Sequence, residues 1–281
     1  MIFIRQKPEE TLLEGLNYMI CRFCSSSDLS ALLTFEEWCS FASSCGDERL
    51  LVSTIVKNNS ELNFESITQC QKCDFLSVGI LPDKGALSTF YDSYYANTKY
   101  QSKEDKKIRR ATRRIKRLSK LVKNGMFLDV GCNLGYSVEA AGRLGYTSHG
   151  IDIDKAAIAK ATDRFDKRNF IENDIETYAK ARNQYDLVFC TEVIEHVIDF
   201  RSFAESLTCL LKKGGILYLT TPDSGHFRTP KKLLEWTEIK PPEHLQWFQK
   251  KHLKSLFESF GVKVSFQPTW KPGIRMVAKK P

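Results

Sequence analysis

The chain has 281 residues, of which 42% are hydrophobic and 27% charged, enough to bury one large core or two smaller ones. No run approaches the roughly 18 apolar residues that a membrane span needs. The opening MIFIRQKPEETLLEGLNYMI also lacks the apolar core and cleavage site of a secretory signal. We therefore expect a cytoplasmic protein whose nine cysteines are reduced thiols rather than a disulfide framework.

The net charge of +8 is concentrated in one segment. Residues 99–123 carry twelve Lys and Arg against two acids, a local charge of +10 that leaves −2 for the other 256 residues. The basic face of this segment has two interpretations, a solvated surface or a binding face for a phosphate-bearing substrate or RNA. Apolar residues recur every three or four positions and predict an amphipathic helix: Ile108, Ala111, Ile115, Leu118 and Val122.

Three zones follow one another along the chain. Residues 1–80 carry cysteines and short strand patterns, and residues 81–123 are helical, with the aromatic stretch LSTFYDSYY near their start. From 124 to 281 strand and helix patterns alternate, which predicts βαβ units on a parallel sheet. Sheets of this kind bind ligands beyond the carboxyl ends of their strands. The expected strands are MFLDV, TSHGIDI, RNFIE, YDLVFC, GGILYLTTP, KVSFQP and GIRMVAKK.

The first predicted strand ends in the glycine-containing turn DVGCNLG. Gly131 and Gly135 allow tight turning, but Asn133 replaces the glycine that a pyrophosphate-binding turn would have. Asn is the non-glycine residue that best tolerates positive φ, so we expect the turn to keep its shape.

The next three strands also end in polar residues. Asp152 follows Gly131 by 21 residues, where nucleoside-binding sheets place an acid on the ribose hydroxyls. The third and fourth ends read Asn173-Asp174-Ile175 and TEVIEH. Each acid alone could be a helix N-cap, but four polar ends on successive strands favour one shared ligand site.

These segments together resemble the class I S-adenosylmethionine-dependent methyltransferases. DVGCNLG, GIDID, NDIE, DLVFCTEVIEHV and LKKGGILYLTTP stand in the order and spacing of that family. The resemblance implies a seven-stranded Rossmann-like sheet whose antiparallel strand comes from the closing pair KVSFQP and GIRMVAKK. It also explains the absent glycines, because S-adenosylmethionine carries no phosphate. The cofactor-binding residues that the resemblance implies are Asp129, Gly131, Cys132, Asn133, Gly135, Asp152, Ile153, Asp174, Ile175, Thr191 and Glu192.

Two C-x-x-C motifs, CRFC and CQKC, occur in the first zone. Four thiolates in such pairs predict a closed tetrahedral zinc site. The 45 residues between the motifs exceed the spacing of a simple ribbon, and Cys39 and Cys45 between them could replace a ligand. The alternative is two unrelated pairs of buried thiols. The predicted zinc ligands are Cys21, Cys24, Cys70 and Cys73.

The front of the chain resembles a methyltransferase subgroup in which a four-cysteine, zinc-ribbon-like module precedes an aromatic stretch and the catalytic domain. Members of that subgroup often methylate sugars or other metabolites. The segment Glu192-Val-Ile-Glu195-His196 is in turn similar to ubiquinone-pathway O-methyltransferases, in which it has been linked to a divalent ion. Both metal interpretations stay open at this point.

Five histidines provide candidates for the base that an alcohol acceptor requires. His149 lies within a predicted strand and is expected to be structural, and His252 lies on a helix that we expect to be exposed. His196 and His244 are the candidate catalytic bases. Their alternatives are a capping or cofactor-orienting role for His196 and a packing role for His244.

Residues 224–247 follow the fifth strand and are expected to roof the acceptor site as an insertion. Arg228 could bind a carboxylate or phosphate there, and Trp236 and Trp247 could form aromatic walls. The predicted function is O-methylation of a small hydroxylated metabolite, most simply a sugar or nucleotide sugar.

The acceptor's phosphates would be held by Arg113 and Arg117 of the basic helix. The rival is an RNA-binding or RNA-modifying methyltransferase, which the basic helix favours. The sequence lacks the aromatics alternating with Lys and Arg that single-strand platforms use.

Overall fold

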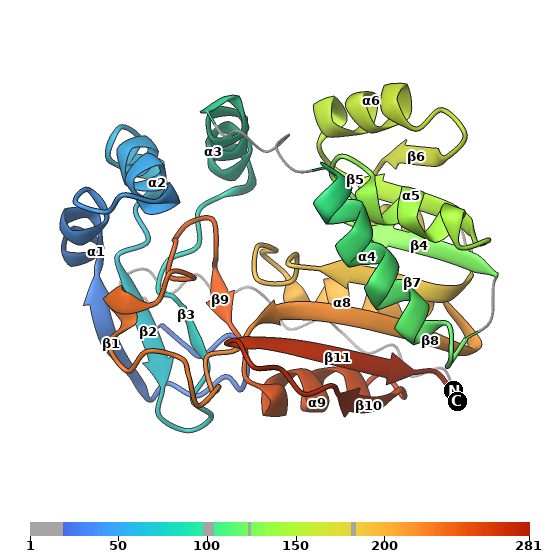
Figure 1. Ribbon diagram of the computed structural model, residues 1–281. Coiled ribbons are helices and arrows are strands. Elements are labelled where there is room, and N and C mark those ends of the chain that lie inside the picture. Colours follow the sequence, from blue (N-terminus) through green and yellow to red (C-terminus); the bar gives the residue numbers. More distant parts are fainter. Residues whose placement is uncertain (1–18, 98–103, 123–124, 181–183) are drawn as a thin grey trace, which may run out of the picture.

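The computed structural model describes residues 19–97, 104–122, 125–180 and 184–281. The opening segment, on which the expectation about a secretory signal rests, lies outside these ranges, as do residues 99–103 of the basic segment. Within them, no helix has the length and apolar character needed to cross a bilayer. The described residues form two sheets with flanking helices (Figure 1).

The larger sheet has seven strands in the order β10-β11-β8-β7-β4-β5-β6. Strands β4 to β8 run parallel, whereas β11 pairs antiparallel with both β8 and β10. This arrangement confirms the predicted seven-stranded Rossmann-like fold. The strands are β4 (Met126–Val130), β5 (Thr147–Asp152), β6 (Asn169–Glu172), β7 (Tyr185–Thr191), β8 (Leu211–Pro222), β10 (Lys263–Phe266) and β11 (Gly273–Lys279).

Helices cover both faces of the larger sheet, as Figure 1 shows. Side chains alternate along each strand, so Phe127 and Leu187 pack on the side of α4 and α5, while Leu128 and Val188 pack on the side of α8 and α9. Both faces are therefore apolar, as expected of a buried parallel sheet. The helices are α4 (Glu104–Leu118), α5 (Tyr136–Arg143), α6 (Lys155–Arg164), α7 (Ile175–Lys180), α8 (Phe200–Cys209) and α9 (Lys250–Glu258).

Residues 104–118 of the basic segment form α4, and the predicted amphipathic character of this helix is confirmed. Ile108, Ala111, Ile115 and Leu118 are buried, while most of its arginines and lysines are exposed. The apolar stripe packs on α5 and on the larger sheet. The helix therefore forms because its apolar stripe is buried, and most of its cations face solvent.

The smaller sheet has four antiparallel strands in the order β1-β2-β3-β9. Two helices that the short strand pattern did not predict, α1 and α2, precede β2; Thr34 caps α1 in a capping box and Asp47 caps α2. The elements are β1 (Leu29–Thr34), α1 (Phe35–Ala42), α2 (Glu48–Lys57), η1 (Ser60–Leu62), β2 (Ser66–Cys70), β3 (Leu76–Val78), α3 (Lys84–Asn97), η2 (Leu233–Glu235) and β9 (Gln246–Trp247).

Strand β9 comes from the segment predicted to roof the acceptor site. Leu76 of β3 pairs with Trp247, and the Trp247 side chain is fully buried in the same core of the smaller sheet as Trp38. The expectation that Trp247 forms a wall of the acceptor site is therefore wrong, because its ring fills this core instead. The zone boundaries at residues 80 and 123 stay predictions, with the qualification that residues 246–247 complete the first zone's sheet.

Candidate functional site

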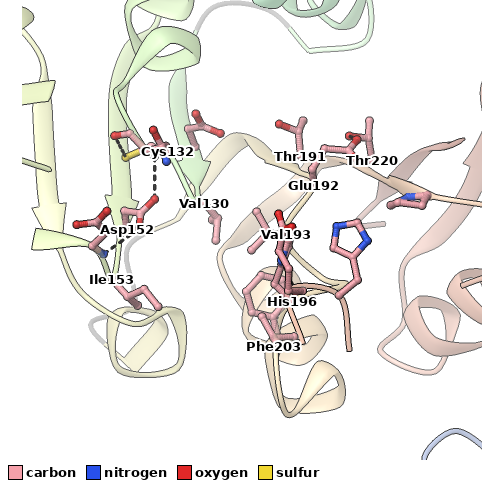
Figure 2. Close-up of a pocket in the computed structure, with 18 of the residues that line it drawn as sticks. Val130, Cys132, Asp152, Ile153, Thr191, Glu192, Val193, His196, Phe203 and Thr220 are labelled. Atoms are coloured by element: carbon pink, nitrogen blue, oxygen red, sulfur yellow. Dashed lines mark hydrogen bonds between the residues drawn. The ribbon is translucent and has the colours of Figure 1, made fainter. Parts of the chain in front are cut away.

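A cavity of about 1900 Å³ lies at the carboxyl ends of the parallel strands. The ends of β4, β5, β7 and β8, the start of β11, helices α3 and α4, and the roof segment all contribute to its lining. Figure 2 shows side chains from several of these elements converging on it. This is the edge at which an open α/β sheet is expected to bind its ligand.

The turn after β4 adopts the left-handed conformation at three positions. Gly131, Asn133 and Gly135 have φ of 72°, 46° and 77°. Asn133 therefore adopts the positive φ that it was expected to tolerate. A Cβ on Gly131 would lie 2.6 Å from Val193 Cγ2, which makes glycine necessary there. Gly131 and Asn133 line the cavity, whereas Gly135 is the N-cap of α5 and lies outside the lining.

Asp152 joins the turn after β4 to the turn after β5. Its carboxylate accepts hydrogen bonds from the backbone N–H of Asn133 at 2.8 Å and of Asp154 at 2.9 Å, drawn in Figure 2. Burial raises the pKa of Asp152, although these N–H groups act in the opposite direction. A carboxylate has about four acceptor positions, so Asp152 keeps capacity for ligand hydroxyl groups.

Asp129 lies beneath this turn and is 4% exposed. Burial raises its pKa well above the usual range, and the nearby charge of Asp152 adds to the effect. Cys132 also lines the cavity, and burial raises the pKa of its thiol.

The third strand end contributes Asp174 and Ile175, which both line the cavity. Asp174 also caps α7, because its Oδ1 accepts from the Thr177 backbone N–H at 2.7 Å, which lowers its pKa. Asp174 is thus both the cap of α7 and a residue of the cavity lining. Ile153 lies at the mouth, 72% exposed.

The fourth strand end contributes Thr191 and Glu192, which line the cavity near the middle of the sheet (Figure 2). Glu192 has φ of 56°, and its Oε1 accepts from the Thr220 hydroxyl at 2.6 Å. Ten of the eleven residues predicted to bind the cofactor therefore line this cavity, Gly135 being the exception.

His196 and His244 meet in the cavity. Their ring centroids are 4.7 Å apart, at 84° to each other. His196 Nδ1 lies 2.6 Å from the Glu243 carbonyl oxygen and His244 Nδ1 lies 2.8 Å from that of Glu238. A carbonyl can only accept, so each Nδ1 carries the proton and each Nε2 carries a lone pair.

Burial keeps both imidazoles neutral. It lowers the pKa of His196 to about 4, with the Lys240 charge adding to the effect. It lowers the pKa of His244 well below the usual range, helped by His196 and Lys240. Both rings thus meet the chemical requirement of a base, a free lone pair on an unprotonated nitrogen.

Glu195 completes a cluster with the two histidines. One ligand atom from each of Glu195, His196 and His244 lies within 4.8 Å of the others. Glu195 Oε2 accepts from the Thr221 hydroxyl at 3.0 Å, while Oε1 has no hydrogen-bond partner within the described ranges and lies 4.0 Å from His196 Nε2. The predicted set of Glu192, Glu195 and His196 is therefore only partly brought together, because Glu192 bonds to Thr220 and His244 takes its place.

The four predicted cysteines converge at the edge of the smaller sheet. Sγ atoms of Cys21 and Cys73 are 3.6 Å apart, as are those of Cys24 and Cys70. Tetrahedral zinc with Zn–S of about 2.3 Å requires a sulfur separation of about 3.8 Å, so the four thiols fit such an ion.

Cys39 and Cys45 lie elsewhere. Cys39 is buried in α1, where burial raises its pKa to about 11, and the Cys45 thiol contacts the Phe41 carbonyl. Neither belongs to the four-thiol cluster, so neither replaces a ligand in it.

Arg22, inside the first cysteine motif, was missed by the sequence interpretation. Its Nη1 donates to Gln246 Oε1 at 2.6 Å and its Nη2 donates to the Ile198 carbonyl. Gln246 Nε2 in turn donates to the Ile194 and Val197 carbonyls at 2.7 and 2.9 Å. The only signal in the sequence was the position of this arginine between two predicted metal ligands. That position does not predict a role, because the partners of the arginine are distant in sequence.

His252 corrects a second expectation. The sequence predicted an exposed residue, but His252 is 1% exposed because its ring packs between Phe23 and Phe75. Its Nε2 lies 2.8 Å from the Cys73 carbonyl, so α9 helps to hold the second cysteine motif. His149 is structural as expected and bonds to the Tyr185 hydroxyl at 3.0 Å.

The basic helix presents part of its charge to the cavity. Lys107, Arg110 and Arg114 line it, whereas Arg113 and Arg117 are exposed and lie outside the lining. The predicted phosphate-holding pair is therefore corrected, because the helical period of 3.6 places those two arginines on another face.

The chain was compared with known proteins. A family model described as "Methyltransferase domain" matches residues 100–265, more than half of the chain. A ubiquinone biosynthesis O-methyltransferase of Vibrio cholerae is 36% identical over 107 residues, which cover 35% of this chain and 44% of that relative. A Coxiella burnetii enzyme of the same name is 32% identical over 98 residues, 34% of this chain and 42% of its own length. The chain thus spans under half the length of these relatives.

Solved structures show the same fold. A 1,6-didemethyltoxoflavin-N1-methyltransferase of Burkholderia thailandensis superposes with a TM-score of 0.55 at 16% identity, covering 73% of this chain and 94% of that one. A SAM-dependent methyltransferase of Archaeoglobus fulgidus gives 0.51 at 18% identity, covering 62% and 94%. At these identities the likeness concerns the fold alone.

Proposed function

The chain belongs to the methyltransferase-domain family, and from this premise we propose that it is an S-adenosylmethionine-dependent methyltransferase acting on a small molecule. The observation that carries the proposal is the convergence of four strand ends on one cavity at the carboxyl edge of the larger sheet. The cavity is lined by the glycine turn after β4, by the buried acids Asp129 and Asp152, and by Asp174 at the third strand end. These groups suit a nucleoside that carries an amino-acid arm better than one that carries phosphates.

In this proposal different residues of the chain bind different parts of the cofactor. Asp152 would accept from the ribose hydroxyls, Asp174 and Ile175 would contact the adenine, and the turn at Gly131 would approach the methionine arm closely. The bound cofactor supplies an electrophilic methyl group on a sulfonium. Much of the protein's contribution is then positioning, worth up to roughly 7–11 kcal/mol in favourable cases.

The reaction we propose is O-methylation of a hydroxylated acceptor such as a sugar or nucleotide sugar. The acceptor oxygen forms a bond to the methyl carbon as the carbon–sulfur bond breaks, and the hydroxyl proton passes to Nε2 of His244 or His196. The neutral state and the Nδ1 bonds of both rings support this role. The leaving thioether is uncharged, so one base suffices for the proton balance.

A phenol O-methyltransferase is the second candidate. The curated relatives are named for ubiquinone biosynthesis, and Glu195, His196 and His244 form a compact set of ligand atoms. In that alternative the cluster would hold a divalent cation beside the acceptor instead of acting as a base. Activity that is abolished by a chelator and restored by Mg²⁺ would select it, whereas chelator-resistant activity selects the imidazole base.

RNA binding through the basic helix is the third candidate. Arg113 and Arg117 are exposed and free to meet phosphates, which favours it, while Arg110 and Arg114 line the cavity. A steep loss of RNA affinity with added salt would support this candidate.

We further propose one structural zinc ion on the four-cysteine cluster, supported by the sulfur separations of 3.6 Å. The ion would stabilise the fold of the smaller sheet and take no part in methyl transfer.

Calorimetric titration with S-adenosylhomocysteine and NAD tests the main proposal. We expect the first to bind and the second not to bind. Asp152→Ala should weaken S-adenosylhomocysteine binding by roughly 1.5–3 kcal/mol, the scale of a hydrogen bond to a charged group. Asp163→Ala, an exposed acid on α6 outside the cavity, is the matched control. Absence of binding by the unaltered protein, or equal effects of the two variants, would contradict the proposal.

A further inference from the structure

Arg228 is stacked on an exposed tryptophan at the mouth of the cavity. Its Cζ lies 3.9 Å from the Trp270 ring centroid and 5.6 Å from that of Phe227. Trp270 and Phe227 are 70% and 76% exposed, unusual for rings of this size outside an interaction site. A cation–π contact holds the guanidinium by its face and leaves the donors on its edge free. Among the described residues, no side chain or carbonyl accepts from that edge.

Hydrogen bonds fix the two loops that make this arrangement. The Arg228 backbone N–H donates to His226 Nδ1 at 3.1 Å, so the His226 proton is on Nε2, which lies 3.3 Å from the Thr269 carbonyl. The Thr269 hydroxyl contacts the carbonyls of Lys271 and Gly273 at 3.0 and 2.9 Å. These bonds hold the backbones of Arg228 and Lys271 in place at the mouth of the cavity.

Arg275 extends the same cationic surface into the cavity. Arg228, Lys271 and Arg275 all line it, and within the described ranges none of the three has an ion-pair partner. Three unpaired cations that converge on one cavity have a ligand anion as their natural partner.

Arg275 lies several strands away from Asp152, the acid proposed to bind the cofactor's ribose. Arg275 pairs with Thr220 of β8, Thr220 with Thr191 of β7, and two further strand steps lead through β4 to Asp152 on β5. Four steps of about 4.8 Å separate Arg275 from the ribose acid by about 19 Å. Arg275 therefore belongs to a part of the cavity that is several strands from the proposed ribose site.

We propose that Arg228, Lys271 and Arg275 form an anion subsite that binds a phosphate group of the acceptor. Trp270 holds the Arg228 guanidinium by its face, so that its N–H groups can donate to the phosphate. The inference rests on the proposed methyltransferase function and specifies its acceptor as a phosphate ester. Three cations match a phosphate dianion or diphosphate better than a single carboxylate, since these anions carry more negative charge and more acceptor oxygens. The open face of Trp270 also offers a stacking surface to a planar ring attached to that phosphate.

The test uses the full chain loaded with S-adenosylhomocysteine and the probes inorganic pyrophosphate, phenyl phosphate and benzoate, titrated by calorimetry. We expect phenyl phosphate to bind more tightly than benzoate. Arg228→Gln and Arg275→Gln should each weaken pyrophosphate binding at least tenfold. Trp270→Ala should weaken phenyl phosphate more than it weakens pyrophosphate. Arg113→Gln and Arg117→Gln, exposed cations outside the cavity, should change either affinity less than twofold.

Equal pyrophosphate affinity in Arg228→Gln, Arg275→Gln and the unaltered protein would overturn the subsite, as would tighter binding of benzoate than of phenyl phosphate. Retained S-adenosylhomocysteine affinity shows that each variant is folded. Loss of S-adenosylhomocysteine binding by the unaltered protein, with pyrophosphate still bound, would instead contradict the proposed function and leave the subsite standing.

Discussion

The two sheets of the molecule are assembled in different ways. Every strand of the larger sheet lies between residues 126 and 279, and its five parallel strands follow one another with helices between them. The smaller sheet takes three strands from residues 29–78 and its fourth, β9, from residues 246–247. Its cysteine end also packs into the core under α8 and α9, through Cys21, Cys70 and Phe75. The smaller sheet is therefore fastened to the larger one at two places.

The candidate base site lies where the two sheets join. His196 follows β7 of the larger sheet, and His244 stands two residues before β9 of the smaller one. The Leu245 backbone N–H donates to the Glu195 carbonyl at 2.9 Å, which ties the two segments together. The comparison teaches that the smaller sheet is a wall of the site, and each prediction below perturbs one of its attachments.

The largest effect is expected from removing a zinc ligand. Cys70→Ser should release the ion and cost much of the roughly 10 kcal/mol or more that a structural zinc contributes to folding. Metal analysis and scanning calorimetry should show under half an equivalent of zinc and early melting of part of the molecule. Cys45→Ser, in the same region but outside the cluster, should keep both zinc and melting temperature. Full zinc retention in Cys70→Ser would refute the assignment.

The difference between the sheets also explains how far the sequence could be interpreted. In the larger sheet each strand and its polar end are encoded locally, so the seven strands, the left-handed Asn133 and ten of the eleven cavity residues followed from patterns and family resemblance. The smaller sheet depends on long-range pairing. A two-residue strand such as Gln246–Trp247 has no periodicity to detect.

The errors share that cause. Trp247 was placed in a wall of the acceptor site and His252 on an exposed helix, but elements from the first zone cover both. Arg22 could not be assigned a role for the same reason, since its partners lie more than 170 residues away.

The second prediction concerns the histidine that enters the smaller sheet. His244→Ala should slow turnover by at least about 100-fold, the usual scale for a general base, with S-adenosylhomocysteine affinity unchanged. Single-turnover kinetics with an acceptor found by screening phosphorylated sugars and phenols would measure it. Near-normal turnover would transfer the role to His196, and His196→Ala measured in parallel would show whether either ring is needed.

A smaller effect is expected from cutting the attachment at Arg22. Arg22→Met would leave Gln246 Oε1 and the Ile198 carbonyl without a donor, at a cost of roughly 1.5–3 kcal/mol in unfolding free energy. Zinc should stay bound, while kcat falls and the cofactor KM does not change, because the loop that carries His196 loses its support.

Arg201→Met is the matched control for this attachment. The Arg201 side chain donates to the Phe23 carbonyl of the same cysteine motif, and within the described ranges it makes no hydrogen bond to the segment that carries His196. It should leave kcat nearly unchanged. Equal loss of kcat in both variants would show that the whole motif matters and that Arg22 has no special positioning role.

The smallest effect is a pH dependence at the junction. Because the pKa of His196 falls to about 4 on folding, the unfolded chain takes up a proton below about pH 6.5 that the folded chain does not. Stability should therefore decline as pH falls from about 6.5 toward 4, by up to about 1.4 kcal/mol per pH unit for this ring. Urea unfolding at pH 7.5 and 5.5 measures the decline, and His196→Gln should reduce it by about that amount. An identical slope in His196→Gln and the unaltered protein would show that His196 titrates normally in the folded chain.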